Sequence, residues 1–448
     1  MQSYDDFLAS KNRRVQLVGI EPDNIPSFFK PHQVDATAFA LRKARAGCFL
    51  DTGLGKTLCE LEFAKQSAHA ANGRALILTP LAVAKQIERE ANKFGYDAKV
   101  IREQSDATSL ISICNYDRLE KLDVSQFGSI VLDESSILKS FTGSVSRSIR
   151  EAFARHRFRL SATATPAPND HMELGQHAEF LSIMNSVEML SKFFINDTSK
   201  ASQEWRLKKH AEESFWDWMS SWAIMAESPA DLGHDASEYV LPKLNIHHHS
   251  VGMSELFASS VIASATNIHD IKRETIIARA EKIASIVDDD YWVIWCDTNY
   301  EADELVKRIP DAVEVRGSMS ADAKEDAIAA FSTGSVKRII TKPSVCGYGL
   351  NWQHCNKMAF VGRSFSYETW YQAVRRCWRF GQKQDVNVHI AVADGEDQIG
   401  LVIDRKSEDH IKMKRAMSIA MRRALGREAE TNVAYHPTHI AEVPQWLK

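Results

Sequence analysis

The stretch "FLDTGLGKT", residues 49–57, places a glycine-rich turn between an apolar run and a helical pattern. Its ending matches the phosphate-binding pattern G-x-x-x-x-G-K-[ST], but Leu50 stands where that pattern requires its first glycine. A strand, a glycine turn and a helix N-terminus together present backbone N–H groups to a phosphate. The stretch therefore predicts either a nucleotide site, with Lys56 at the phosphates and Thr57 on magnesium, or a simple strand-to-helix turn.

Short β-branched runs alternate with amphipathic patterns over roughly the first 165 residues, which indicates a parallel sheet covered by helices. We expect strands at "GCFL", "RALILTP", "SLISICNY", "SIVLDE" and "FRLSAT". Helices are expected at 57–71, 82–94 and 144–155.

From residue 171 the strand signal is absent, and a helical segment rich in tryptophan follows. We expect Trp205, Trp216, Trp218 and Trp222 to lie mostly in the core of a helical insertion, with DNA contact as the alternative for one or two of them.

The α/β alternation then resumes, with strands expected at "YWVIWC", "AVEVR", "RIITK", "KMAFVG" and "VNVHIAV" and helices at 300–308, 321–331 and 367–378. A long basic amphipathic helix follows and ends at Gly426, and its charged face is either solvated or in contact with phosphates. We divide the chain into an α/β domain (1–170), a helical insertion (171–244), a second α/β domain (245–393) and a basic helical extension (394–448).

The composition favours a globular protein over a membrane or secreted protein. The 448 residues, 44% hydrophobic and 25% charged, are typical of a globular protein with two or three domains. No apolar run approaches the ~20 residues that cross a bilayer, and the first residues show no signal peptide, so we expect a cytoplasmic protein. The net charge of -4 does not indicate a nucleic-acid binder, so such binding would depend on local charge.

Metal and disulfide chemistry have weak support. The seven cysteines form no C-x-x-C pair, so we expect neither a structural zinc site nor disulfides. The run His247-His248-His249 could bind a metal, but adjacent strand residues point to opposite faces, which favours a polar strand.

Two further elements carry chemistry. Asp133 and Glu134 follow an apolar run, and α/β sheets bind ligands at the carboxyl ends of their strands. Asp133 is expected to hold magnesium and Glu134 to polarise an attacking water, with a helix cap as the alternative.

If 367–378 is a helix, Gln372, Arg376 and Arg379 share one face. Arginines opposite a triphosphate accelerate phosphoryl transfer by about 10³–10⁵, although a solvated or DNA-facing stripe is the usual alternative.

Taken in order, these segments resemble the motifs of a superfamily-two helicase-like ATPase of the Swi/Snf type, over roughly residues 28 to 393. The matching segments are "FKPHQVDA", "DTGLGKT" (motif I), "LILTPLAVAKQIERE" (Ia), "ISICNYDRL", "VLDESS" (II), "LSATATPAPND" (III), "VIWCDTNYEADEL" (IV), "KPSVCGYGLNWQ" (V) and "QAVRRCWRFGQ" (VI). The wording of motifs II and III and the tryptophan-rich insertion are similar to members encoded by phages and prophages, which would place the protein in the cytoplasm of a bacterial host.

The resemblance implies two RecA-like lobes with ATP and Mg²⁺ in the cleft between them and double-stranded DNA across both. The catalytic residues that it implies are Lys56, Asp133, Glu134, Arg376 and Arg379. It implies nucleotide contacts from Gln33, which would read the adenine, and from Gly53, Gly55, Lys56, Thr57, Gly349 and Gln372. Thr57 and Asp133 would hold magnesium, and Asn115, Lys139 and Asn351 are candidate DNA contacts.

The implied activity is translocation along duplex DNA with little sequence specificity and strong salt dependence. The alternatives are a strand-separating DNA or RNA helicase and a nucleotide-gated clamp that hydrolyses ATP poorly.

Three departures from the family pattern bear on coupling between the lobes. Motif II has Ser136 where histidine is usual, so we expect the link to motifs III and VI to pass through Ser136. Motif VI has Arg375 where an acid or glycine is common and Trp378 where histidine is common. Motif III is expected at 163–165 rather than 161–163.

Overall fold

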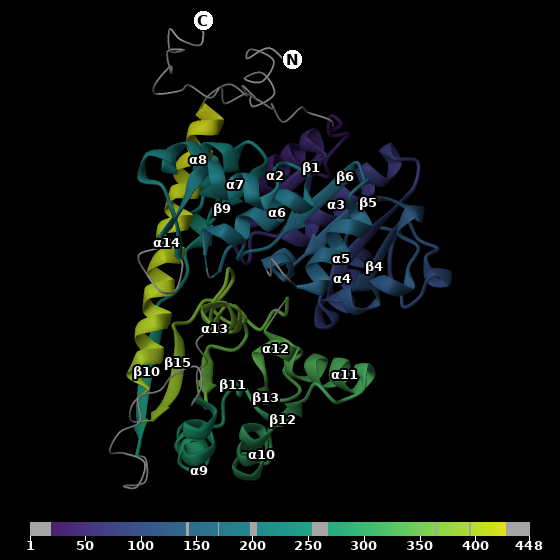
Figure 1. Cartoon of the computed structure of the whole chain (residues 1–448). Helices are drawn as coiled ribbons and strands as arrows, with labels where there is room; N and C mark the ends of the chain where they lie inside the picture. The colour runs from purple at the N-terminus through teal and green to yellow at the C-terminus, as the bar shows by residue number, and fades with distance from the viewer. Residues whose placement is uncertain are drawn as a thin grey trace, which may run out of the picture.

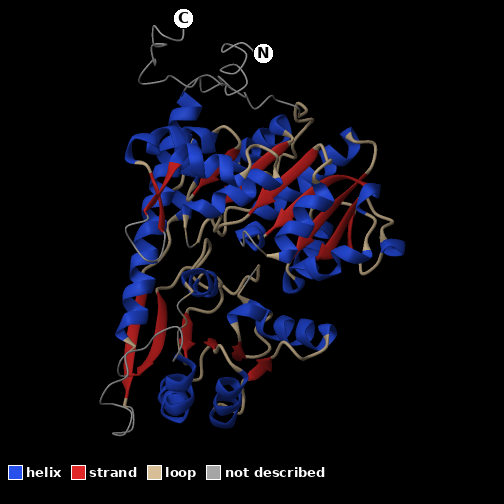
Figure 2. Cartoon of the chain, viewed as in Figure 1, coloured by secondary structure: helices blue, strands red, loops and turns tan. Residues whose placement is uncertain are grey.

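The computed structural model describes residues 19–139, 143–168, 170–197, 204–252, 268–347, 349–362, 364, 366–393 and 396–426. They form two α/β lobes in tandem, each built on its own parallel sheet and covered by helices (Figure 1, Figure 2). This arrangement confirms the predicted fold class of two RecA-like lobes followed by a C-terminal helix.

The sheet of lobe 1 has seven parallel strands in the order β3-β4-β2-β5-β6-β1-β9. The strands are β1 (Arg45–Leu50), β2 (Arg74–Thr79), β3 (Ala98–Val100), β4 (Ile111–Asn115), β5 (Phe127–Asp133), β6 (Phe158–Ala162) and β9 (Ala223–Ala226). The helices that connect and cover them are α2 (Pro31–Lys43), α3 (Lys56–Ala70), α4 (Leu81–Lys93) and α5 (Ser144–Phe153). The five strands and three helices predicted for this part of the chain are confirmed, while β3 was not predicted.

The central strands are buried on both faces, which is why they are continuous apolar runs. Leu76, Ile77 and Leu78 of β2, for example, are all 0% exposed. The order of the strands places β5, β6 and β1 side by side and parallel. Their carboxyl ends therefore lie at one edge of the sheet, where the loops that follow them can meet.

The segment 171–244, which was predicted as a helical insertion, contains strands as well as helices. β9 extends the sheet of lobe 1 by pairing with β1, and β7 (Phe194–Asp197) pairs antiparallel with β8 (Glu204–Leu207). Without β9, the edge of β1 would leave its backbone N–H and C=O groups unpaired. This tertiary pairing stabilises a four-residue strand that carries almost no signal in the sequence. The helices of the segment are α6 (Leu174–Phe180), α7 (Ser186–Phe193) and α8 (Glu212–Ser220).

The tryptophans of this segment pack mainly into a core, as predicted, but this core is that of lobe 1 and not that of a separate insertion. Trp216 and Trp222 belong to the core of lobe 1, and the half-buried Trp205 and Trp218 pack against it. Large aromatic side chains supply much of the apolar area that docks α8 onto the sheet.

The sheet of lobe 2 has six parallel strands in the order β10-β15-β14-β11-β13-β12. They are β10 (Leu244–Val251), β11 (Trp292–Trp295), β12 (Val313–Val315), β13 (Arg338–Thr341), β14 (Lys357–Phe360) and β15 (Val386–Ala393). The helices are α9 (Ile268–Ile286), α10 (Asn299–Arg308), α11 (Ala321–Ser332), α12 (Pro343–Cys346) and α13 (Tyr367–Val374). The five strands predicted here are confirmed.

The histidine run lies in β10 and behaves as a polar strand. The rings of His247 and His249 stack on His389 of the neighbouring β15, with centroids 4.7 and 5.2 Å away. His249 Nε2 lies 3.0 Å from His389 Nδ1, so at least one of the two rings is neutral.

Helix α14 (Asp397–Gly426) matches its prediction from end to end and runs alongside both lobes (Figure 1). Its first turns pack Ile399 and Ile403 against Tyr367 of lobe 2. Further along, Met413 and Met417 belong to the core of lobe 1. Among the described helices, even this long one lacks an apolar stretch that could cross a bilayer.

Replacing Arg279 with Met is expected to lower the free energy of unfolding by about 3–5 kcal/mol, because it leaves the buried Glu396 unpaired. Arg279 is 0% exposed and lies 2.7 Å from Glu396, just before α14 begins. Urea denaturation followed by circular dichroism measures the loss. The control is Arg42→Met, which removes an exposed pair with Glu21 and should change stability by at most about 1 kcal/mol. Equal effects of the two changes would contradict the prediction.

Candidate functional site

The glycine loop lies at the end of β1, and both of its glycines are required by the backbone. Gly53 and Gly55 have φ angles of +91° and +80°, which residues other than glycine rarely adopt. A Cβ atom on Gly55 would lie 2.0 Å from Gln33 Nε2, and one on Gly53 would lie 2.7 Å from Phe380 Cβ of lobe 2. Gly53 of motif I and Phe380 of motif VI therefore lie in close contact.

Lys56 begins α3, so the first N–H groups of that helix point toward the loop. Its ammonium group donates a 2.9 Å hydrogen bond to the Leu50 carbonyl. Thr57, the next residue, is half-buried in the same turn. The loop thus lies beside a cation and a helix N-terminus, which suits an anion such as phosphate.

Asp133 ends β5 at the same edge of the sheet, and its carboxylate accepts a 2.6 Å hydrogen bond from the Thr79 hydroxyl. Burial and then the neighbouring Glu134 raise the pKa of Asp133 to about 7, although Thr79 and Lys56 act in the opposite direction. Burial and Asp133 also raise the pKa of Glu60, a fully buried carboxyl on α3. The site thus holds more carboxyl groups than its nearby cation can neutralise.

These surroundings fit a divalent cation held by Asp133 and Thr57. In the described part of the chain, no three His, Cys, Asp or Glu side chains form a group that could hold a metal ion by themselves. Magnesium bound by one or two protein groups usually completes its octahedron with waters and phosphate oxygens. The donor set therefore fits magnesium that arrives together with a nucleotide.

Glu134 has a strained backbone, with φ of +49° in the left-handed region. Such strain in a residue other than glycine is concentrated at functional sites. The Thr163 hydroxyl lies 3.4 Å from its carboxylate and donates to it.

A path of hydrogen bonds continues from Thr163 across the lobes. The Thr163 hydroxyl accepts a 3.1 Å bond from the Thr165 amide, and the Thr165 hydroxyl accepts a 3.0 Å bond from Gln372 Nε2 of α13. The other side-chain atom of Gln372, Oε1, accepts from Arg376 at 3.0 Å. Motif II is thereby connected through motif III to motif VI.

This path corrects the expectation that Ser136 replaces the usual histidine. Ser135, rather than Ser136, contacts motif III by accepting a 2.9 Å bond from Ser161. The connection to lobe 2 instead begins at Glu134 and Thr163. Both candidate positions of motif III are used, because Ser161 contacts Ser135 while Thr163 and Thr165 form the path.

The helix predicted at 367–378 is shorter, because α13 ends at Val374 and turns follow. Gln372, Arg376 and Arg379 therefore do not share a helical face, and that prediction was wrong. The two arginines still converge, since each donates to the Leu350 carbonyl, at 3.0 and 3.1 Å. Sequence periodicity cannot detect a helix that stops where tertiary hydrogen bonds replace its own.

The side chains of Arg376 and Arg379 concentrate positive charge beside Leu350. Burial, followed by Arg376 and Arg375, lowers the pKa of Arg379 to about 9, so this guanidinium stays charged at neutral pH. Clustered cations favour the binding of an anion, which would relieve their mutual repulsion.

The remaining predicted positions are scattered around the cleft. The Gln33 side chain accepts from the Lys30 amide at 2.9 Å and donates to the Leu54 carbonyl at 3.1 Å, beside the loop. Gly349, with φ of +68°, approaches Val83 of α4 so closely that a Cβ atom would lie 2.2 Å from Val83 Cγ2.

The three candidate nucleic-acid contacts lie in different surroundings. Asn115 is buried at the end of β4, whereas Asn351 is exposed. Lys139 forms an ion pair with Glu368 of lobe 2.

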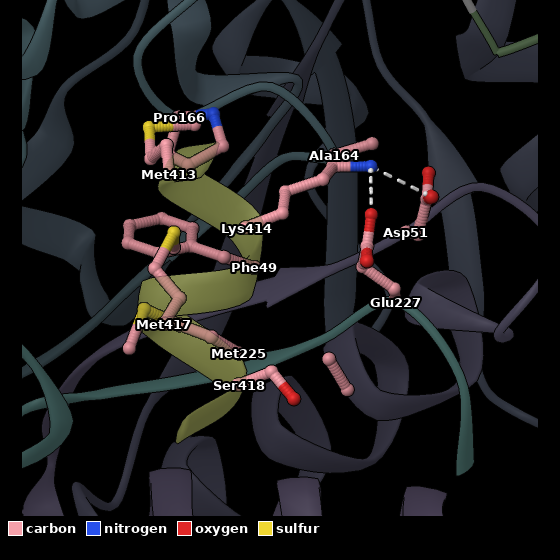
Figure 3. A pocket seen from close by; sticks show the side chains of 11 residues that line it. Phe49, Asp51, Ala164, Pro166, Met225, Glu227, Met413, Lys414, Met417 and Ser418 are labelled. Carbon is pink, nitrogen blue, oxygen red and sulfur yellow. Dashed lines mark hydrogen bonds and ion pairs between the residues drawn. The ribbon is translucent and has the colours of Figure 1, made fainter. Parts of the chain in front are cut away.

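Sequence reasoning missed a buried ion cluster at the start of the loop, and Figure 3 shows two of its members, Asp51 and Lys414. The Asp51 carboxylate lies 3.1 Å from Arg375 and 2.9 Å from Lys414, and it accepts a 3.0 Å hydrogen bond from the Tyr371 hydroxyl. The unusual Arg375 of motif VI was the available signal, because a buried arginine requires an acid that the sequence alone does not identify.

Comparisons with known proteins bear mainly on lobe 2. Residues 275–381 match the model of the helicase conserved C-terminal domain, which confirms the helicase-like resemblance. A search of curated proteins finds no match. Among solved structures, the chain is similar to the SWI2/SNF2 ATPase core of Sulfolobus solfataricus in complex with dsDNA. The two are 19% identical, with 93% of this chain and 99% of that chain covered and a TM-score of 0.42.

Proposed function

We propose that this chain, whose residues 275–381 match the helicase conserved C-terminal domain, is an ATP-driven motor that moves along double-stranded DNA. The observation that carries the proposal is the hydrogen-bond path from Glu134 in lobe 1 to Arg376 in lobe 2. A motor must couple events at the phosphates to movement between lobes, and a continuous chain of hydrogen bonds is a physical means of carrying that coupling.

Each residue has a role in the proposed hydrolysis. Lys56 and the N-terminus of α3 bind the β- and γ-phosphates, and Glu134 orients and polarises the attacking water. Arg376 and Arg379 stabilise the charge that develops during transfer. Magnesium, when bound by Thr57 and Asp133, neutralises phosphate charge.

Around this reaction, the proposed nucleotide contacts include Gln33 at the adenine and the glycines of the loop. Gly53 and Gly55 allow the backbone to approach the phosphates, and Gly349 and Gln372 complete the site from lobe 2.

The proposed track is duplex DNA, bound through its phosphates. Asn115, Lys139 and Asn351 are the proposed contacts, and the basic face of α14 can add to them. Lys139 would exchange its partner Glu368 for a phosphate, so DNA binding would loosen one contact between the lobes. We also propose the domain division at residues 170, 244 and 393, with the segment 171–244 completing lobe 1 through β9.

ATP hydrolysis is expected to rise when duplex DNA is added and to fall steeply with salt, because each DNA phosphate that the protein neutralises contributes about −0.9 to the slope of log K against log salt. Phosphate release is measured without nucleic acid, with duplex DNA and with single-stranded DNA. The Glu134→Gln variant provides the hydrolysis-deficient baseline. An ATPase rate that no DNA changes would contradict the motor.

The type of motor is tested in the same preparation. Displacement of a third strand from a triplex without separation of a duplex indicates translocation. Separation of forked or blunt duplexes would instead favour a helicase.

A further inference from the structure

Asp51, Arg375, Lys414 and Tyr371 form a buried cluster that we call the loop clamp. Asp51 directly follows β1, and Lys414 lies in α14. Tyr371 lies in α13, and Arg375 directly follows that helix. Arg375 also binds the next residue of the loop, since it donates hydrogen bonds to both the hydroxyl and the carbonyl oxygen of Thr52. Lobe 2 and α14 thus hold the two residues that lead into the glycine loop.

The charged side chains of the loop clamp are buried, so the Asp51 carboxylate depends on Arg375 and Lys414 to balance its charge. The Asp51 side chain is 8% exposed, and those of Arg375 and Lys414 are 5% and 11% exposed. Burial by itself would raise the pKa of Asp51, but Arg375 and Lys414 together hold it well below its usual range. The two cations docked on this buried carboxylate therefore favour its ionised form.

Lys414 cannot move independently of the two lobes. Its helix is fixed to lobe 1 by Met413 and Met417 in the core and by hydrogen bonds from Ser418 and Arg422 to Asp231. The same ammonium group also lies 3.2 Å from Glu227, at the end of β9, and Figure 3 shows it between the two carboxylates. At its other end the helix begins directly after β15 of lobe 2, so it bridges the lobes.

We propose that Lys414 and Arg375 are positioning residues that hold the glycine loop, through Asp51 and Thr52, in the conformation that binds nucleotide. Docking of α14 and of lobe 2 on lobe 1 then determines nucleotide affinity. This inference rests on the proposed ATPase function and adds a means by which the C-terminal helix controls it.

Lys414→Met keeps the length of the side chain and leaves Asp51 paired with Arg375, so the chain is expected to fold. Because the loop loses one of its two cationic supports, we expect the Kd of a fluorescent ATP analogue and the KM for ATP to rise by about tenfold. The value of kcat should change by less than about twofold, since saturating ATP restores the loop. Lys414→Arg, which keeps the charge, should recover most of the affinity.

The matched control is Lys412→Met on the same helix, whose side chain is 72% exposed and pairs only weakly with Asp409. It should leave Kd, KM and kcat unchanged. A double-mutant cycle with Asp51→Asn tests whether Lys414 acts through Asp51: the double variant should bind the analogue no more weakly than Asp51→Asn alone.

Two failures are distinguishable. If the unmodified protein does not bind the analogue, the proposed function itself is overturned. If it does bind, and Lys414→Met binds as tightly as Lys412→Met, the clamp inference alone is overturned. A loss of kcat and melting temperature without a change in KM would also overturn it, because that result indicates a merely structural role.

Discussion

Lys56→Ala is expected to abolish ATP turnover while leaving the fold intact. Lys56 is the only side-chain cation that the glycine loop itself supplies, and its ammonium group lies 2.9 Å from the Leu50 carbonyl at the mouth of the loop. No other group of the loop can neutralise the β- and γ-phosphates during transfer. The lysine is half-buried and takes no part in the apolar core, so its removal should not unfold lobe 1.

Phosphate release and circular dichroism check both parts of this expectation. The matched control is Lys99→Ala, which removes an exposed lysine of β3 in lobe 1. That variant should keep the wild-type rate. A Lys56→Ala protein that hydrolyses ATP at the wild-type rate would refute the role given to the loop.

Glu134→Gln is expected to reduce hydrolysis by about 10²–10⁴-fold while ATP still binds. Glutamine keeps the size of the side chain but cannot accept a proton from the attacking water. It also removes the negative charge that, after burial, raises the pKa of Asp133. Asp133 should therefore ionise more readily, so magnesium and ATP should bind at least as tightly as in the unmodified protein.

Single-turnover hydrolysis and binding of a fluorescent ATP analogue separate the two effects. Glu120→Gln, on the exposed surface of lobe 1, is the control and should hydrolyse ATP normally. Loss of binding together with hydrolysis would mean that Glu134 supports the structure of the site rather than its chemistry.

Much of the fold was predictable because the signals are local. Strands buried on both faces in a parallel sheet must be continuous apolar runs, and α14 has an amphipathic pattern bounded by its own sequence. The residues at strand ends were predictable for a related reason. In a parallel sheet the carboxyl ends lie at one edge, so the loop after β1 and Asp133 after β5 had to be neighbours if β1 and β5 were close in the sheet.

The errors arose where tertiary contacts replace local preference. β9 has four residues and becomes a strand because the edge of β1 needs a partner. α13 stops at Val374 and turns follow, where the Arg376 carbonyl accepts a 3.0 Å hydrogen bond from the Trp352 amide of another segment. The link from motif II passes through Thr163 because the strained backbone of Glu134 aims its side chain there.

The two sheets, the long C-terminal helix and the residue types at the ends of the strands could be predicted from the sequence, since each depends on periodicity and short-range sterics. Which distant charges meet depends instead on tertiary packing. Asp51 and Lys414 are 363 positions apart, and neither has a local pattern that indicates the other. A buried carboxylate takes as partners whichever cations the packing of lobes and helix brings within reach, and that packing depends on the whole chain.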